Sequence, residues 1–121
     1  MNPDKNFYEI PKEIKNNAKK ALNLIEQGYK GGTETGLKRA QQLVNDRYLS
    51  LDDIRDMRNW FARHLYTSYP GYKKFNYYNA PNRGAIAWLL WGGSDAIGYL
   101  NNLTDELNST FNKNYKKLEL Y

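Results

Sequence analysis

Apolar residues recur every three or four positions through most of this chain, and that spacing limits its fold more than any other feature. Such a period places the apolar side chains on one face of an α-helix, and that face must be buried. The spacing predicts an amphipathic helix that opens at Pro11, a second helix over residues 34–45, and a third that follows Ser50 and continues to Leu65. We therefore expect an all-α domain whose helices bury these faces against one another.

The strongest local signals mark the start of the third helix. Ser50 precedes Asp53 by three residues, which predicts a capping box in which each side chain accepts a hydrogen bond from the other residue's backbone N–H. Leu49 and Ile54 flank this cap at the spacing of a hydrophobic staple. Thr33 is expected to cap the second helix with its hydroxyl group.

The helical period disappears between Tyr66 and Arg83. Residues 69–72 (Tyr-Pro-Gly-Tyr) and 79–82 (Asn-Ala-Pro-Asn) are turn signals within this segment. We therefore predict one long tyrosine-rich loop between the third and fourth helices. Irregular segments of this length are uncommon inside compact domains and are often functional.

Two more helices are predicted after this loop. Residues 84–91 are apolar nearly all round, which is typical of a short helix buried at the centre of a domain. A pair of glycines ends it, and Ser94 is expected to cap a fifth helix that continues to Phe111, with a restart at Thr104.

The length of 121 residues fits a single domain, since domains usually hold about 100–200 residues. We predict about five helices. The chain is expected to divide into a flexible arm over residues 1–10, a helical core over residues 11–103 and a helical extension over residues 104–121. No segment approaches the roughly 20 apolar residues that span a bilayer, and the first residues lack the apolar core of a signal peptide. A soluble cytoplasmic protein without a membrane partner is expected.

Enzymatic chemistry finds little support in the residue types present. Cysteine is absent and only one histidine occurs, which disfavours thiolate metal sites, zinc sites and cysteine nucleophiles. The chain also lacks a glycine-rich phosphate loop and a nucleophile elbow. His64 follows Arg63 at a helix end, where a cationic cap is the favoured role. We predict a non-enzymatic protein without a cofactor or a metal.

The positive charge of the chain is concentrated in one stretch. Between Ile54 and Ser94 lie six basic residues and one acidic residue, and their net +5 equals the net charge of the whole chain. The same stretch holds ten of the 18 aromatic residues. Cations contact phosphates and aromatic rings stack on unpaired bases, so this composition suits nucleic acid. The predicted contacts are the cations Arg58, Arg63, Lys73, Lys74 and Arg83 and the rings of Tyr72, Tyr77 and Tyr78.

Two other interpretations of this stretch stay open. In the first, the aromatic rings pack the loop onto the helices, and the aliphatic stems of lysine and arginine cover them. In the second, the segment from Tyr66 to Tyr78 docks on another protein, because exposed tyrosines suit interface hot spots.

Two phrases resemble a known kind of domain. Residues 61–64 (FARH) and 87–93 (AWLLWGG) are similar to a small domain that recurs in bacteriophage and prophage genomes, often attached to or encoded near head-assembly proteins. The similarity covers roughly residues 11–103, and the chain departs from it at residues 66–78 and beyond Thr104. No activity comes with this resemblance. It implies a viral protein in the cytoplasm of an infected bacterial host or in the virion, with a phage head protein or a host protein as the alternative partner. A role in host takeover or in countering host defence is a third candidate.

Because each phrase ends a predicted helix, we expect the two helix ends to meet. Either His64 or Arg63 is predicted to bond the carbonyl groups at residues 91–93, or to stack on Trp91. The residues of this predicted clasp are Arg63, His64, Trp88, Trp91, Gly92 and Gly93.

Overall fold

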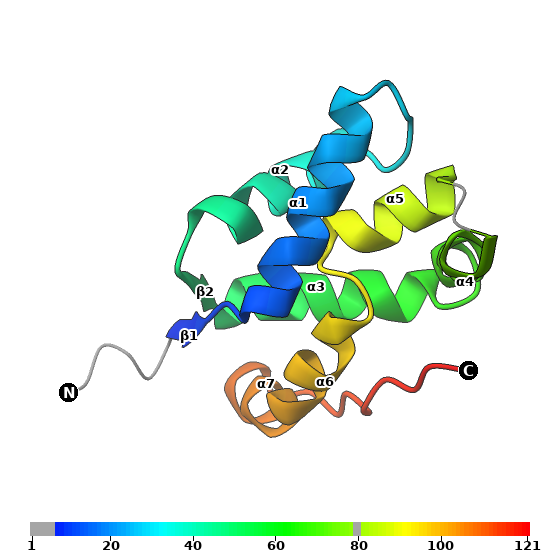
Figure 1. The fold of residues 1–121 in the computed structure, drawn as a ribbon. Coiled ribbons are helices and arrows are strands. Elements are labelled where there is room, and N and C mark those ends of the chain that lie inside the picture. The colour runs from blue at the N-terminus through cyan, green and yellow to red at the C-terminus, as the bar shows by residue number, and fades with distance from the viewer. Residues whose placement is uncertain (1–6, 79–80) are drawn as a thin grey trace.

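The computed structural model describes residues 7–78 and 81–121, most of which are helical (Figure 1). The mainly-α prediction is therefore confirmed, although this part of the chain holds seven helices rather than about five. In chain order the elements are β1 (Phe7–Glu9), α1 (Lys12–Glu26), α2 (Glu34–Asn45), β2 (Tyr48–Ser50), α3 (Leu51–His64), α4 (Ser68–Tyr78), α5 (Arg83–Leu90), α6 (Asp95–Asn102) and α7 (Thr104–Phe111).

The first three helices begin where the local signals predict. Helix α2 spans residues 34–45, and the Thr33 hydroxyl accepts the backbone N–H of Gly36 at 3.2 Å. At the start of α3, both bonds of the capping box between Ser50 and Asp53 are present. Leu49 on the preceding strand is fully buried, as a hydrophobic staple requires.

Helix α5 forms the centre of the core. Figure 1 shows it between α1 and α4, and it also packs against α2. Five of its eight residues are buried: Ala85, Ile86, Trp88, Leu89 and Leu90. Neighbouring helices cover α5 on several sides, which explains why its sequence is apolar nearly all round.

The long loop predicted after the third helix is wrong, because residues 68–78 form helix α4. Pro70 lies in the first turn of α4, where a missing backbone N–H costs nothing. Gly71 serves close packing rather than a turn. A Cβ atom built on Gly71 would lie 3.1 Å from the Cα atom of Gly84, so the two glycines let α4 and α5 cross closely.

The flexible arm predicted over residues 1–10 is also wrong from Phe7 onward, and its first six residues lie outside the described part. Strand β1 pairs antiparallel with β2, placing Tyr8 opposite Leu49. Ile10 is buried, and its backbone N–H donates to the carbonyl of Arg47 at 2.9 Å. Two strands of three residues are too short to produce an alternating sequence pattern, so sequence analysis missed them.

The predicted extension over residues 104–121 is helical only in its first part. Helix α7 begins at Thr104 and ends at Phe111, and the next residue, Asn112, has a left-handed backbone with φ of 54°. Residues 113–121, which we call the strap, carry no helix, and Leu118 within them is buried. In Figure 1 the strap runs beneath α3 from α7 towards α4.

Among the residues that the structure describes, every helix is too short or too polar to cross a membrane.

Candidate functional site

Arg58, predicted to contact nucleic acid, instead holds the strap. Its guanidinium group donates to the carbonyl of Lys116 at 3.1 Å and lies 4.5 Å from the centre of the Tyr115 ring. Burial lowers the pKa of Arg58, with the Tyr115 hydroxyl acting in the opposite direction. A guanidinium group that is half-buried under the strap is poorly placed for phosphate contacts.

The other predicted cations divide into two groups. Lys73 also serves the strap, since its ammonium group donates to the carbonyl of Tyr121 at 3.3 Å and lies 4.2 Å from the centre of that ring. Arg63 is exposed beside Arg39 of α2. Lys74 and Arg83 are exposed, and neither forms an ion pair within residues 7–78 and 81–121.

The predicted aromatic contacts do not form an open stacking surface. The Tyr72 ring is half-buried and lies with its centre 6.4 Å from that of Trp88. Tyr72 therefore packs α4 onto the core, in line with the interpretation that the aromatic residues serve packing. Tyr77 and Tyr78 end α4, and their side chains lie outside the described residues.

The predicted clasp exists as a meeting of helix ends, but its contacts differ. Trp60 of α3 stacks on Trp91 with ring centres 5.1 Å apart, and His64 stacks on the same Trp60 at 4.3 Å. The His64 Nδ1 atom lies 2.8 Å from the carbonyl oxygen of Trp60, within its own helix. Because Trp60 stands between them, His64 does not reach Trp91.

Other residues take the roles assigned to the clasp. The Gly92 carbonyl accepts the Asn17 side-chain amide of α1 at 2.9 Å, rather than His64 or Arg63. The guanidinium group of Arg39 lies 5.4 Å from the Trp91 ring centre, in the place predicted for Arg63. Gly93 lies against Asn17, with a backbone φ of 71°.

The Trp88 indole N–H donates to the hydroxyl of Ser94 at 3.0 Å. That hydroxyl therefore anchors the central tryptophan and makes no cap to α6, contrary to the predicted cap.

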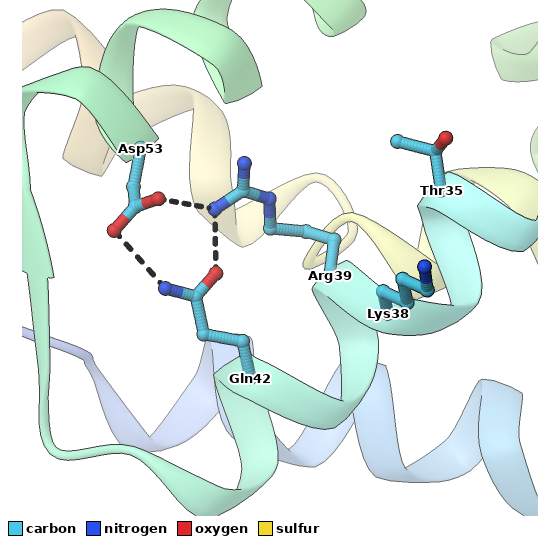
Figure 2. A pocket seen from close by; sticks show the side chains of 5 residues that line it. All are labelled: Thr35, Lys38, Arg39, Gln42 and Asp53. Carbon is cyan, nitrogen blue, oxygen red and sulfur yellow. Dashed lines mark hydrogen bonds and ion pairs between the residues drawn. The ribbon is translucent and has the colours of Figure 1, made fainter.

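A polar network joins α2 to the start of α3 (Figure 2). Arg39 donates to Gln42 at 2.5 Å and to Asp53 at 2.9 Å, and the Gln42 amide donates to the other oxygen of Asp53 at 3.0 Å. Asp53 also accepts the backbone N–H and the hydroxyl group of Ser50. These groups satisfy one another, so the network fixes two helices and leaves no reactive group.

The hollow beside this network is small. Its volume is about 210 Å³, and its lining includes Arg39, Arg63 and Trp91. Ligand pockets usually measure about 300–1,000 Å³, so this hollow is smaller than most of them. Within residues 7–78 and 81–121, no three potential metal-ligating side chains come together.

Asp53 predicts a pH dependence of stability. Burial by itself raises the pKa of Asp53, but hydrogen bonds from Arg39, Ser50 and Gln42 outweigh it and hold this pKa below its usual 3.8. The stabilisation is therefore complete well above pH 3.8 and is lost as the pH falls through the lower folded-state pKa. We expect Asp53→Asn to cost about 1 kcal/mol at pH 7 and to flatten the stability profile below about pH 4, measured by urea unfolding.

Asp52→Asn is the matched control, because that neighbouring carboxylate is exposed and, among the residues that the structure describes, pairs with Arg55 alone. An equal loss of stability at pH 7 in both variants would contradict the special role of Asp53.

Exposed cations lie on α1, on the loop after it, on α4 and at the start of α5, and α5 packs against both α1 and α4. We call this group of cations the basic face. The ammonium group of Lys20 on α1 lies 5.0 Å from the ring centre of Phe75 on α4, which brings α1 close to Lys74. A Cβ atom built on Gly31 would lie 2.7 Å from the carbonyl oxygen of Arg83, so the loop bearing Lys30 touches the start of α5. The basic face consists of Lys19, Lys20, Lys30, Lys74 and Arg83, all exposed.

Sequence analysis found only Lys74 and Arg83 of this face. The lysines of α1 have the pattern of an ordinary solvated helix face. Their neighbours in the sequence do not indicate that these lysines have different roles. Lys15 on the same helix does something different: its ammonium group donates to the carbonyls of Leu43 and Asp46 and so caps the end of α2. Only the packing of α1 on α2 distinguishes Lys15 from Lys19 and Lys20.

Comparison of the chain with protein-family models, with curated proteins and with solved structures finds no match. The resemblance to a phage-linked domain thus remains a prediction from residues 61–64 and 87–93.

Proposed function

We propose that the protein binds nucleic acid through the basic face, by contacts to the phosphate backbone. The observation that carries this proposal is the set of five exposed cations on the basic face. None of the five forms an ion pair among the residues that the structure describes. A surface of one sign attracts the phosphates of DNA or RNA and raises the rate of association.

Backbone contacts suit the basic face better than base recognition. Four of its five cations are lysines, which act as point charges towards phosphate and lack the paired donors that arginine offers to guanine. Tyr72, the described ring of the predicted stacking set, is engaged with Trp88. Binding is therefore expected to depend little on base sequence.

The proposal includes a setting in phage biology, in an infected bacterium or a virion. Support for this setting comes from the resemblance carried by residues 61–64 and 87–93.

The proposal predicts a steep dependence of affinity on salt. Fluorescence anisotropy with a labelled mixed-sequence DNA duplex, and with RNA of the same length, would be measured from 50 to 200 mM NaCl. For four or five phosphate contacts on the duplex, log K against log salt is expected to fall with a slope of about −3.5 to −4.5. Replacing Lys74 and Arg83 together with glutamine should reduce the steepness of this slope by about 2.

The double replacement of Lys113 and Lys117 with glutamine is the control. It removes the same charge from exposed positions of the strap, outside the basic face. We expect this variant to keep the salt slope of the unmodified chain. Undetectable binding at 50 mM NaCl, or an equal effect of both double variants, would overturn the proposal.

A further inference from the structure

The strap is held as a bound peptide would be held. Asn108 of α7 donates its amide to the carbonyl of Tyr115 at 3.1 Å and accepts the backbone N–H of the same residue at 2.7 Å. Asn101 of α6 makes the same pair of bonds with Leu118, at 2.9 and 2.7 Å. Two asparagine side chains thus form hydrogen bonds with backbone N–H and carbonyl groups of the strap, and these bonds do not depend on the identity of its side chains.

Side chains of the strap contact the rest of the protein at every third position, and we call the surface that they contact the groove. Tyr115 lies against Arg58, Leu118 is buried, and the Tyr121 ring stacks on Tyr66 with centres 5.3 Å apart. The Tyr121 hydroxyl also donates to the carbonyl of Leu65 at 2.8 Å. A spacing of three matches the three residues per turn of a polyproline II helix, the conformation in which many extended peptides are recognised.

The strap fits one part of this groove poorly. The Nε atom of Arg58 is buried and has no hydrogen-bond partner among the described residues. Unsatisfied buried donors on charged groups are costly, and a carboxylate is the acceptor that guanidinium prefers. The strap offers Arg58 the carbonyl of Lys116 and the ring of Tyr115 but no carboxylate, and its sequence contains three lysines.

We infer that this groove binds an extended acidic segment of another protein, which displaces the strap. The partner has a carboxylate where the strap has Tyr115, an aliphatic residue three positions later and an aromatic residue after three more. Asn101 and Asn108 hold its backbone, and Arg58 pairs with its carboxylate. Displacement is feasible because Leu118 is the only buried side chain of the strap, so release of the strap exposes little apolar surface. The inference rests on contacts of the strap and is independent of the basic face.

The test uses the full chain and two fluorescent peptides. One has the strap sequence of residues 113–121, and the other carries Tyr115→Glu. Titration followed by fluorescence anisotropy is expected to show about tenfold tighter binding of the glutamate peptide, since a buried charge-assisted bond is formed. A chain with Tyr121→Ala, which weakens its own strap, should bind both peptides more tightly because less of the groove is occupied.

Two groove variants connect this binding to the named residues. Arg58→Gln should abolish the preference for the glutamate peptide, whereas Asn101→Ala should weaken both peptides equally. Should either variant lose helical content by circular dichroism, Asn108→Ala provides the second measurement of backbone binding.

Three results of the peptide titrations would overturn the inference. These are no saturable binding of the glutamate peptide to the folded Tyr121→Ala chain, an equal affinity for both peptides, or a preference that survives Arg58→Gln. Dimers of the full chain that exchange straps, detected by light scattering, would also overturn it in favour of a second copy as the occupant.

Discussion

Trp88→Ala is expected to lower the free energy of unfolding by about 3–5 kcal/mol, the usual cost of truncating a large buried aromatic residue. Trp88 is fully buried, and its ring meets Phe61 edge-on at 4.7 Å and lies 4.8 Å from Tyr69. The truncation leaves a cavity where α3, α4 and α5 meet. Domains are stable by only about 5–15 kcal/mol, so much of the total is lost. Urea unfolding followed by circular dichroism measures the change.

Ser94→Ala is the control for the hydrogen bond of the indole. It removes the acceptor of the Trp88 N–H while leaving the ring in place, and should cost about 1–3 kcal/mol, less than the truncation. A loss below about 1 kcal/mol for Trp88→Ala would contradict the central position of this ring.

Gly71→Ala is expected to destabilise the protein although alanine is the better helix former. The new Cβ atom would lie 2.7 Å from the Asn82 side-chain oxygen. The Asn82 side chain cannot move aside easily, because both of its polar atoms are bonded. Its oxygen accepts the backbone N–H of Ala85 at the start of α5, and its amide nitrogen donates to the carbonyl of Gly71. Overpacking costs about 1–3 kcal/mol, which exceeds the gain of about 1 kcal/mol from helix propensity.

Gly98→Ala on α6 is the matched control. A Cβ atom there meets nothing within 4 Å, so only the propensity gain remains and stability should rise by about 0.5–1 kcal/mol. Thermal unfolding of the two variants should therefore shift in opposite directions. A stabilised Gly71→Ala variant would show that α4 and α5 separate easily at their crossing.

Sequence reasoning succeeded where a structure depends on neighbours along the chain. The bounds of α2 and the capping box of α3 follow from residues within four positions of one another. It failed at α4, because Pro70 and Gly71 are typical of a turn when considered alone. Pro70 is tolerated because it lies in the first turn of α4, and Gly71 is required by the approach of Gly84, which lies 13 residues further along the chain.

The same distinction applies to the candidate sites. Arg58 and Lys73 lie in the basic stretch that composition identifies, but the strap that they hold is 58 and 48 residues away in sequence. The residues near Arg58 in the sequence do not indicate that its guanidinium group will donate a hydrogen bond to a distant carbonyl. The contact of Lys20 with Phe75, which joins α1 to α4, likewise links residues 55 positions apart in the sequence.

The arrangement of the tryptophans also gives the protein an internal optical probe. All three tryptophans of the chain lie in one cluster, with Trp60 centred 6.0 Å from Trp88 and nearly parallel to Trp91 at 5.1 Å. Their emission and near-ultraviolet dichroism therefore come from a single place, where α3 and α5 join. Loosening of that junction changes the tryptophan signal directly. The strap holds no tryptophan, and its release affects this signal through Tyr69, whose ring contacts both Tyr121 and Trp88. Unlabelled protein can thus distinguish opening of the core from release of the strap.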